Sequence, residues 1–120
     1  MNNDLQNRIK QIDTENFIWI IYLIIIALSY KANYYEKDYF INKNNNSKNK
    51  YIKINSLVFL TLVLVYIYFE NDALKSLKNK TQAKYDNLSF IATTLVLIAG
   101  LIFLYISIND TNIETEIAFN

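Results

Sequence analysis

The segment from Leu88 to Ile108, LSFIATTLVLIAGLIFLYISI, runs for 21 residues without a charged side chain. A helix rises about 1.5 Å per residue, so a helix of this length spans the roughly 30 Å hydrocarbon core of a bilayer. Thirteen of its residues are Leu, Ile, Val or Phe. Their insertion into the membrane contributes roughly −4 to −8 kcal/mol, which outweighs the cost of the few small or polar residues. We therefore expect a transmembrane helix here.

Two further apolar blocks precede this segment, Phe17 to Tyr30 and Ile52 to Phe69. A soluble helix is rarely apolar on all sides, and three such helices in 120 residues would leave little polar surface to keep the chain dissolved. The sequence predicts an all-α integral membrane protein with three transmembrane helices in a small bundle.

The apolar blocks and the polar segments between them predict seven regions. They are a polar N-terminal tail (1–16), a first transmembrane helix with an interfacial aromatic extension (17–41), a polar linker (42–51), a second transmembrane helix (52–70), a charged loop (71–87), a third transmembrane helix (88–108) and an acidic C-terminal tail (109–120). The linker contains NKNNNSKNK, which has no apolar residue, so we expect it to be solvated and mobile.

The apolar run after Phe17, which is followed by Ala27-Leu28-Ser29, loosely resembles the end of a secretory signal. The residues before it carry a net charge of −1 rather than a positive charge, and Phe17-Ile18-Trp19 is bulky. These features favour retention of the segment as a helix.

Small and polar residues recur at a regular spacing in the third segment. Thr93, Gly100 and Ser107 are seven residues apart, with Val96 and Phe103 between them. Such a period places all five on one helix face and is typical of the close-packed contact between membrane helices. We expect this face to pack on another helix while the Leu and Ile positions meet lipid. The alternative is that three small residues share the spacing by chance.

Aromatic and basic residues flank the apolar blocks, where amphipathic rings and snorkelling lysines favour the membrane interface. The alternative is that a tyrosine-rich composition scatters rings everywhere. The expected interfacial residues are Trp19, Tyr30, Lys31, Tyr34, Tyr35, Lys53, Tyr66 and Tyr68. Lys31, Asn33, Lys53 and Asn55 would share one level at the membrane surface, where they either snorkel or contact lipid phosphates.

Lysine and arginine counts leave the orientation in the membrane open. With three spans, the N-terminal tail and the second loop share one side with 2 + 4 = 6 basic residues, and the first loop and C-terminal tail share the other with 6 + 0 = 6. The positive-inside rule is therefore tied. We favour a cytoplasmic first loop because the first helix more often decides, and a tie also permits insertion in both orientations.

The composition excludes most catalytic chemistry. The chain has no His, no Cys and a single Gly, so it lacks the residues for common triads, zinc sites, thiol nucleophiles and phosphate-binding loops. The acidic pairs Glu36/Asp38, Glu70/Asp72 and Glu114/Glu116 are two residues apart, which points their side chains in opposite directions on a helix. We predict that they are solvated, and we expect no enzyme, no metal and no cofactor.

Two functions from different classes remain open. The first is a non-enzymatic accessory or interaction protein that binds a membrane protein, or a second copy of itself, through the Thr93/Gly100/Ser107 face. The second is an oligomeric pore former, because three short spans in a chain of this size resemble some phage holins. The resemblance is limited to size and span number, and the acidic tail departs from the basic tail of many holins. A small transporter subunit ranks third, because no charged residue lies in the inner part of any block.

The expected partners are the lipid bilayer and, within it, another membrane protein or copy. With a net charge of +1, nucleic acid is not expected. Abundant Asn, Lys, Ile, Tyr and Phe indicate A/T-rich codons, which suggest a bacterial source and a multi-pass location in the cell membrane, either an inner or a plasma membrane.

Overall fold

The computed structural model describes residues 3–78 and 84–113. It contains three α-helices, α1 (Asn3–Asn42), α2 (Asn45–Lys78) and α3 (Asp86–Asn109). Each is long and apolar enough to cross a membrane. The predicted fold class is therefore confirmed: the described chain is all-helical, with three membrane-spanning helices.

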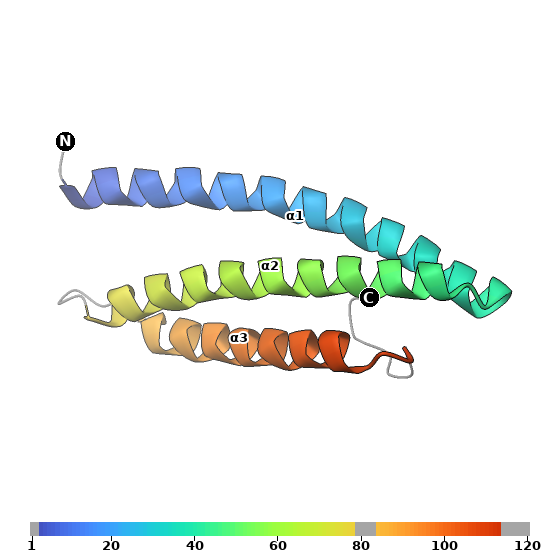
Figure 1. The fold of residues 1–120 in the computed structure, drawn as a ribbon. Helices are drawn as coiled ribbons and strands as arrows, with labels where there is room; N and C mark the ends of the chain where they lie inside the picture. Colours follow the sequence, from blue (N-terminus) through green and yellow to red (C-terminus); the bar gives the residue numbers. More distant parts are fainter. Residues whose placement is uncertain (1–2, 79–83, 114–120) are drawn as a thin grey trace.

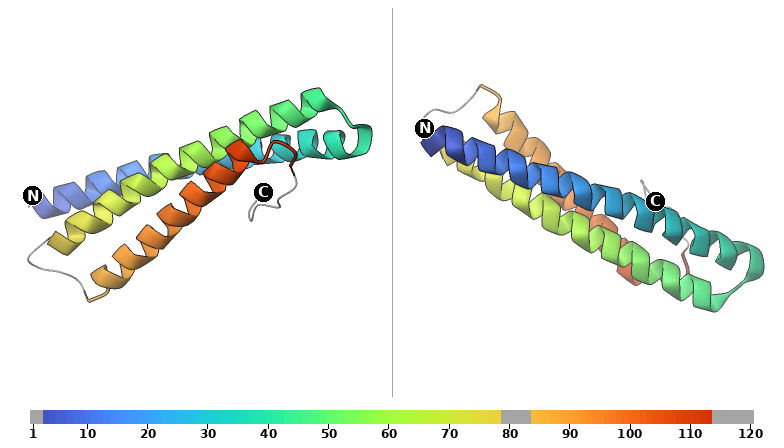
Figure 2. Two further views of the ribbon diagram at one scale, coloured as in Figure 1. Left: turned by 60° about the horizontal axis from the view of Figure 1, so that its bottom comes forward. Right: turned by 90° about the horizontal axis from the view of Figure 1, so that it is seen from above.

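The three helices form an open layer with α2 in the middle. Helix α2 packs against both α1 and α3, whereas the backbones of α1 and α3 do not approach each other. Figures 1 and 2 show this order, with α3 diverging from α2 toward its own N-terminus. The molecule measures 60 × 25 × 16 Å, so it is long and flat. Much apolar surface of α1 and α3 therefore stays uncovered.

The helices are longer than the apolar blocks. Helix α1 begins at Asn3, although the sequence predicts a tail up to residue 16, and α2 continues to Lys78 inside the predicted charged loop. Neither extension contains Pro or Gly, so nothing in the backbone stops the helix. A side-chain contact also joins the two extensions, since Gln11 donates a hydrogen bond to Asp72 at 2.7 Å.

The prediction of a mobile linker over residues 42–51 is wrong, because α2 begins at Asn45 and only a tight turn separates it from α1. Lys43 adopts φ 55°, and its N–H bonds to Tyr39 O at 2.8 Å, which closes the end of α1. The Asn44 side chain then accepts hydrogen bonds from the N–H groups of Asn46 (3.0 Å) and Ser47 (3.4 Å) and so caps α2. The asparagine-rich segment therefore provides a cap for α2 and is not disordered at the turn.

The Asp38 carboxylate ties the two sides of this turn together. It accepts hydrogen bonds from Asn42 at 2.6 Å, from Asn44 at 3.2 Å and from the Ser47 hydroxyl. The bonds from Ser47 and Asn42 are the main causes that lower the pKa of Asp38 below its ordinary value. Asp38 stays accessible to solvent, and its carboxylate in addition holds the turn together.

The turn belongs to a helical hairpin that extends beyond α3. Asn55 of α2 lies opposite Ser107, near the end of α3, so the ten residues of α2 before Asn55 reach about 15 Å further. Lys48 lies over the Tyr39 ring and Lys50 over the Tyr35 ring, with 5.6 and 5.3 Å to the ring centroids. The hairpin end is thus an ordered, lysine-rich projection (Figure 1).

The chain returns to the base of this hairpin after α3. Ile113 is buried in a cluster with Ala32 of α1 and Tyr51 of α2. Ile113, in the predicted acidic tail 109–120, therefore packs against the helices. The rest of that tail lies outside the described residues.

Candidate functional site

The face of α3 singled out by its seven-residue spacing lies largely against α2 of the same chain. Gly100 is buried, and a Cβ atom at this position would lie 2.9 Å from Tyr66 Cδ2. The Phe103 ring lies 5.7 Å from the Phe59 ring, centroid to centroid. Only glycine allows the Tyr66 ring to approach this closely.

A polar cluster closes the same contact at the other end of α3. Ser107 is buried, and its hydroxyl accepts a hydrogen bond from Asn55 Nδ2 at 3.2 Å and lies 3.1 Å from Ser56 Oγ. The expectation that Asn55 snorkels or contacts lipid phosphates is wrong, because Asn55 is only 1% exposed. The sequence contains no signal for this burial, since it depends on which residue of α3 faces position 55.

The other two residues of the predicted face are less covered. Thr93 is half-buried, and its hydroxyl bonds to Ser89 O of its own helix at 2.8 Å. Val96 is 45% exposed. Gly100 and Ser107 are therefore occupied by α2, while Val96 remains open to the surroundings.

An apolar groove of about 520 Å³ opens beside the Gly100 contact. It lies between α2 and α3, and its lining residues are Phe59, Leu62, Tyr66, Leu95, Val96, Ala99, Gly100 and Phe103. Gly100 is 12 residues, or about 18 Å, from Leu88, so the groove lies near the middle of the apolar stretch. Its lining is apolar, so it is suited to an apolar group.

The predicted interfacial residues separate into two sets. Most of them are exposed, as expected of side chains that meet the headgroup region, and these are Trp19, Tyr30, Lys31, Tyr34 and Lys53. Tyr35 instead packs on the Ala32–Tyr51 cluster. The Tyr66 ring lies on Gly100, near the middle of the apolar stretch of α3 and not at its end, where an interfacial belt is expected. Tyr68 is half-buried at the level of Asp72 and Thr14.

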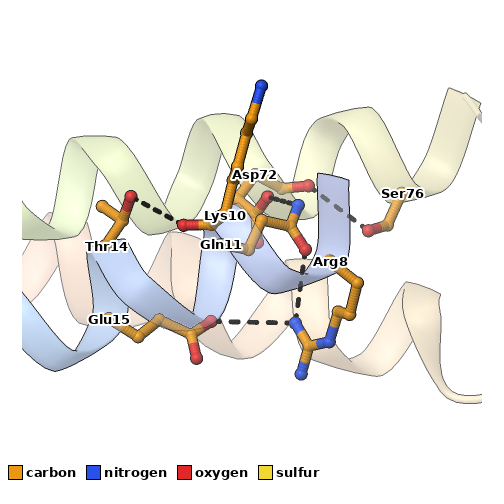
Figure 3. A network of polar contacts seen from close by, with 7 residues as sticks. All are labelled: Arg8, Lys10, Gln11, Thr14, Glu15, Asp72 and Ser76. Carbon is orange, nitrogen blue, oxygen red and sulfur yellow. Dashed lines mark hydrogen bonds and ion pairs between the residues drawn. The ribbon is translucent and has the colours of Figure 1, made fainter. Parts of the chain in front are cut away.

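Polar side chains gather where α3 diverges from α2. Gln11 joins α1 to Asp72 of α2, and Arg8 lies 3.3 Å from Gln11 Oε1 and 3.8 Å from Glu15 Oε1 (Figure 3). A polar pocket of about 250 Å³ is lined by Glu15, Phe69, Asp72, Ala73, Ser76, Asp86, Ser89 and Thr93. Within residues 3–78 and 84–113, no three acidic, His or Cys residues form a group that could hold a metal ion.

Glu70 extends this polar end into the apolar stretch of α3. Thr94 Oγ1 lies 2.8 and 3.0 Å from the two carboxylate oxygens of Glu70, and 2.8 Å from Phe90 O. Thr94 is six residues, or about 9 Å, beyond Leu88. Glu70 and Asp72 do point toward different helices, as their spacing predicts, and both are half-buried and hydrogen-bonded to a neighbouring helix.

No protein-family model, no curated protein and no solved structure matches this chain. The candidate site consists of an apolar groove near the middle of the apolar stretch of α3, with a polar cluster at each end.

Proposed function

We propose that this protein is a non-enzymatic accessory protein of a membrane, and that it acts by binding a transmembrane helix in the groove between α2 and α3. The groove is the observation that supports the proposal. Its lining is apolar, and Ala99 is a small residue of the kind that lets a helix approach closely. Because Gly100 and Ser107 already contact α2, the docking surface is the open part of the face, around Leu95 and Val96.

The open layer of helices supports a binding role as well. Helices α1 and α3 each contact α2 alone, so large apolar side chains on both outer helices have no partner within the described chain. Within a bilayer such surfaces meet lipid or another helix, and a groove favours a helix because shape complementarity increases the dispersion contacts that drive association there.

The arrangement of polar groups weighs against the holin-like pore. A water-filled pore needs a polar face along the whole helix, whereas the levels of Asn55 and Glu70 are separated by the apolar groove lining. The carboxyl group of Glu70 contacts Thr94 and provides no continuous path for a transported ion. The binding function is therefore preferred over the pore former and the transporter subunit.

For location, we propose a bacterial cell membrane, because the amino-acid usage indicates A/T-rich codons. The lysine-rich hairpin end is proposed to face the cytoplasm. It carries all six lysines of the first loop. Labelling of a cysteine introduced at residue 43 from each side of the membrane tests the orientation, since the chain has no Cys of its own.

The docking proposal is tested by a photo-crosslinking residue at Leu95 in cells. A crosslinked product of twice the chain mass identifies a second copy, and a product with another membrane protein identifies that partner. Val96→Trp, which fills the groove, should reduce this product about tenfold or more, whereas Ile102→Trp should not, because Ile102 is exposed and does not line the groove.

Two outcomes contradict the proposal. Crosslinks to lipid alone would show that no helix occupies the groove. Collapse of the membrane potential on induced expression of the chain would support the pore instead.

A further inference from the structure

Helix α1 has an exposed face on the side opposite to α2. Residues seven apart face α2, and of these Ile18, Ile25 and Ala32 are buried. Within the described chain α1 packs on α2 alone (Figure 1). The exposed face carries a row of residues that we call the α1 seam, and its members are Leu5, Ile9, Ile12, Asn16, Trp19, Leu23 and Ile26. The α1 seam therefore has no partner within the residues that the structure describes.

The spacing of the α1 seam is that of a coiled coil. Its members are alternately four and three residues apart from Leu5 to Ile26. A repeat of this kind keeps one row of side chains between two helices that supercoil around each other, at the a and d positions of a heptad. The a positions are Ile9, Asn16 and Leu23, and the d positions are Leu5, Ile12, Trp19 and Ile26.

Lipid does not account for the N-terminal part of the seam. The only apolar residues among residues 2–16 are Leu5, Ile9 and Ile12. All three belong to the seam and are 42–51% exposed. The exposed polar residues Arg8 and Asp13 lie on either side of them, so the apolar stripe is narrow. A narrow stripe is typical of a coiled-coil contact, whereas a lipid-facing surface is broadly apolar. A second helix is therefore the expected cover.

Asn16 favours a second copy of the same chain as the source of that helix. It is the one polar member of the seam, and it occupies an a position. In a parallel dimer the two equivalent a residues lie side by side, so the two Asn16 amides can hydrogen-bond to each other. A single asparagine at such a position sets the register and the number of helices. A partner of another sequence would have to supply a matching polar group.

The charges beside the seam agree with a parallel dimer. In that arrangement a g residue of one helix faces the e residue five positions further along the other helix. Arg8 is at a g position and Asp13 at the matching e position, so opposite charges meet twice between the copies. Within one chain the Arg8 side chain is 59% exposed and its nitrogen lies 3.8 Å from Glu15 Oε1, so it stays accessible to a second copy. Parallel packing also gives both copies the same orientation in the membrane.

We infer that a second copy of the chain covers the α1 seam, so that two α1 helices form a parallel, in-register coiled coil. The seam lies on α1, whereas the docking groove lies between α2 and α3, and α1 does not pack against α3. The inference therefore does not depend on the proposed function, and its test examines a different surface.

Disulfide formation between single cysteines tests the inference in membranes that contain the full chain, which has no Cys of its own. Equivalent d residues meet across the two-fold axis, so Ile12→Cys should form a linked dimer on mild oxidation with copper phenanthroline. Asn7→Cys is the matched control, because Asn7 is exposed at the same end of α1 but lies outside the seam, at an f position. The initial rate of dimer formation should be about tenfold or more higher for Ile12→Cys than for Asn7→Cys. Ile12 is exposed within one chain, so its replacement removes no buried contact of the monomer.

A second substitution examines the register. Asn16→Asp in the Ile12→Cys chain places two carboxylates side by side in the contact. Like charges in such a position repel, so the rate of disulfide formation should fall about tenfold or more at neutral pH. Asn7→Asp adds the same charge to the same helix outside the seam, and it should leave the rate unchanged.

Three results would overturn the inference. Equal rates for Ile12→Cys and Asn7→Cys would indicate random collision of the chains. An Ile12→Cys chain that stays unlinked would show that lipid or another protein covers the seam. A rate that Asn16→Asp leaves unchanged would place Asn16 outside the contact.

Discussion

Gly100→Ala tests the contact that sets the distance between α2 and α3. The new Cβ atom would lie 2.9 and 3.1 Å from Tyr66 Cδ2 and Cε2, and 3.5 Å from Val63 Cγ2. Contacts under 3.0 Å force the Tyr66 ring or one of the helices to move, and overpacking of this kind costs about 1–3 kcal/mol. Alanine also favours the helix over glycine by about 0.8–1.0 kcal/mol. The expected net loss is therefore about 1 kcal/mol, with an upper bound near 2 kcal/mol.

A double-mutant cycle with Tyr66→Ala separates these two effects. Without the ring, the steric cost disappears and the helix propensity remains, so Gly100→Ala should be neutral or stabilising in that background. The interaction energy of the cycle is expected to be about 1–3 kcal/mol. The effect of Gly100→Ala on the free energy of unfolding should therefore change sign when the Tyr66 ring is removed. A mutation that destabilises the helix for another reason would not show this change of sign.

Pyrene labels on Lys53→Cys and Ile108→Cys supply the measurement. These positions flank the Asn55–Ser107 contact, both are exposed, and no native Cys competes for the label. Pyrene excimer emission reports the α2–α3 contact during SDS-driven unfolding in mixed micelles. If Gly100→Ala shifts the unfolding midpoint equally with and without the Tyr66 ring, the close approach is not the cause and the reasoning is refuted.

Two further predictions concern the polar ends of the molecule. Thr94→Val should lower the free energy of unfolding by about 1–3 kcal/mol, because it leaves the half-buried Glu70 without its hydroxyl partner. Thr93→Val should have a smaller effect, because the Thr93 hydroxyl bonds only to its own helix. Equal losses for the two variants in the same SDS titration would contradict this prediction. The hairpin turn should depend on pH, because the pKa of Asp38 is lowered in the folded state, chiefly by Ser47. The folded state then binds fewer protons than the unfolded state, so this stabilisation is complete above the ordinary pKa of 3.8 and is lost as pH falls through the lowered value. NMR shifts of the Asn46 and Ser47 amides should move toward unfolded values on acidification in the wild type and stay constant in Asp38→Asn. A pH response that survives in Asp38→Asn would assign it to another group.

Part of the α3 face could be predicted from the sequence and part could not. The seven-residue spacing placed Gly100, Phe103 and Ser107 on one face, and all three contact α2. The spacing did not identify the other half of the contact. Asn55 and Tyr66 were expected at the membrane surface because both lie near polar or aromatic ends of their block. Their burial depends on the alignment of α2 with α3, which no single segment encodes.

The hairpin turn illustrates a different limit. Composition alone predicts disorder for residues 42–51, because the segment has no apolar side chain to bury. The structure orders its turn through the caps that Asn44 and Asp38 provide. Capping depends on a few neighbouring residues, so Asn, Asp and Ser at cap positions indicate the turn. The average polarity of the segment does not distinguish such a turn from a disordered linker.

The sequence by itself determined that the chain is helical and crosses a membrane three times. Insertion is a sum of transfer free energies within one segment, and a helix satisfies its own backbone, so neither result needs a partner. The tertiary structure decided which side chains meet: Tyr66 on Gly100, Glu70 beside Thr94, and Asn55 beside Ser107. These contacts arise from the register between helices, and a shift of one residue rotates each face by about 100° and would separate them.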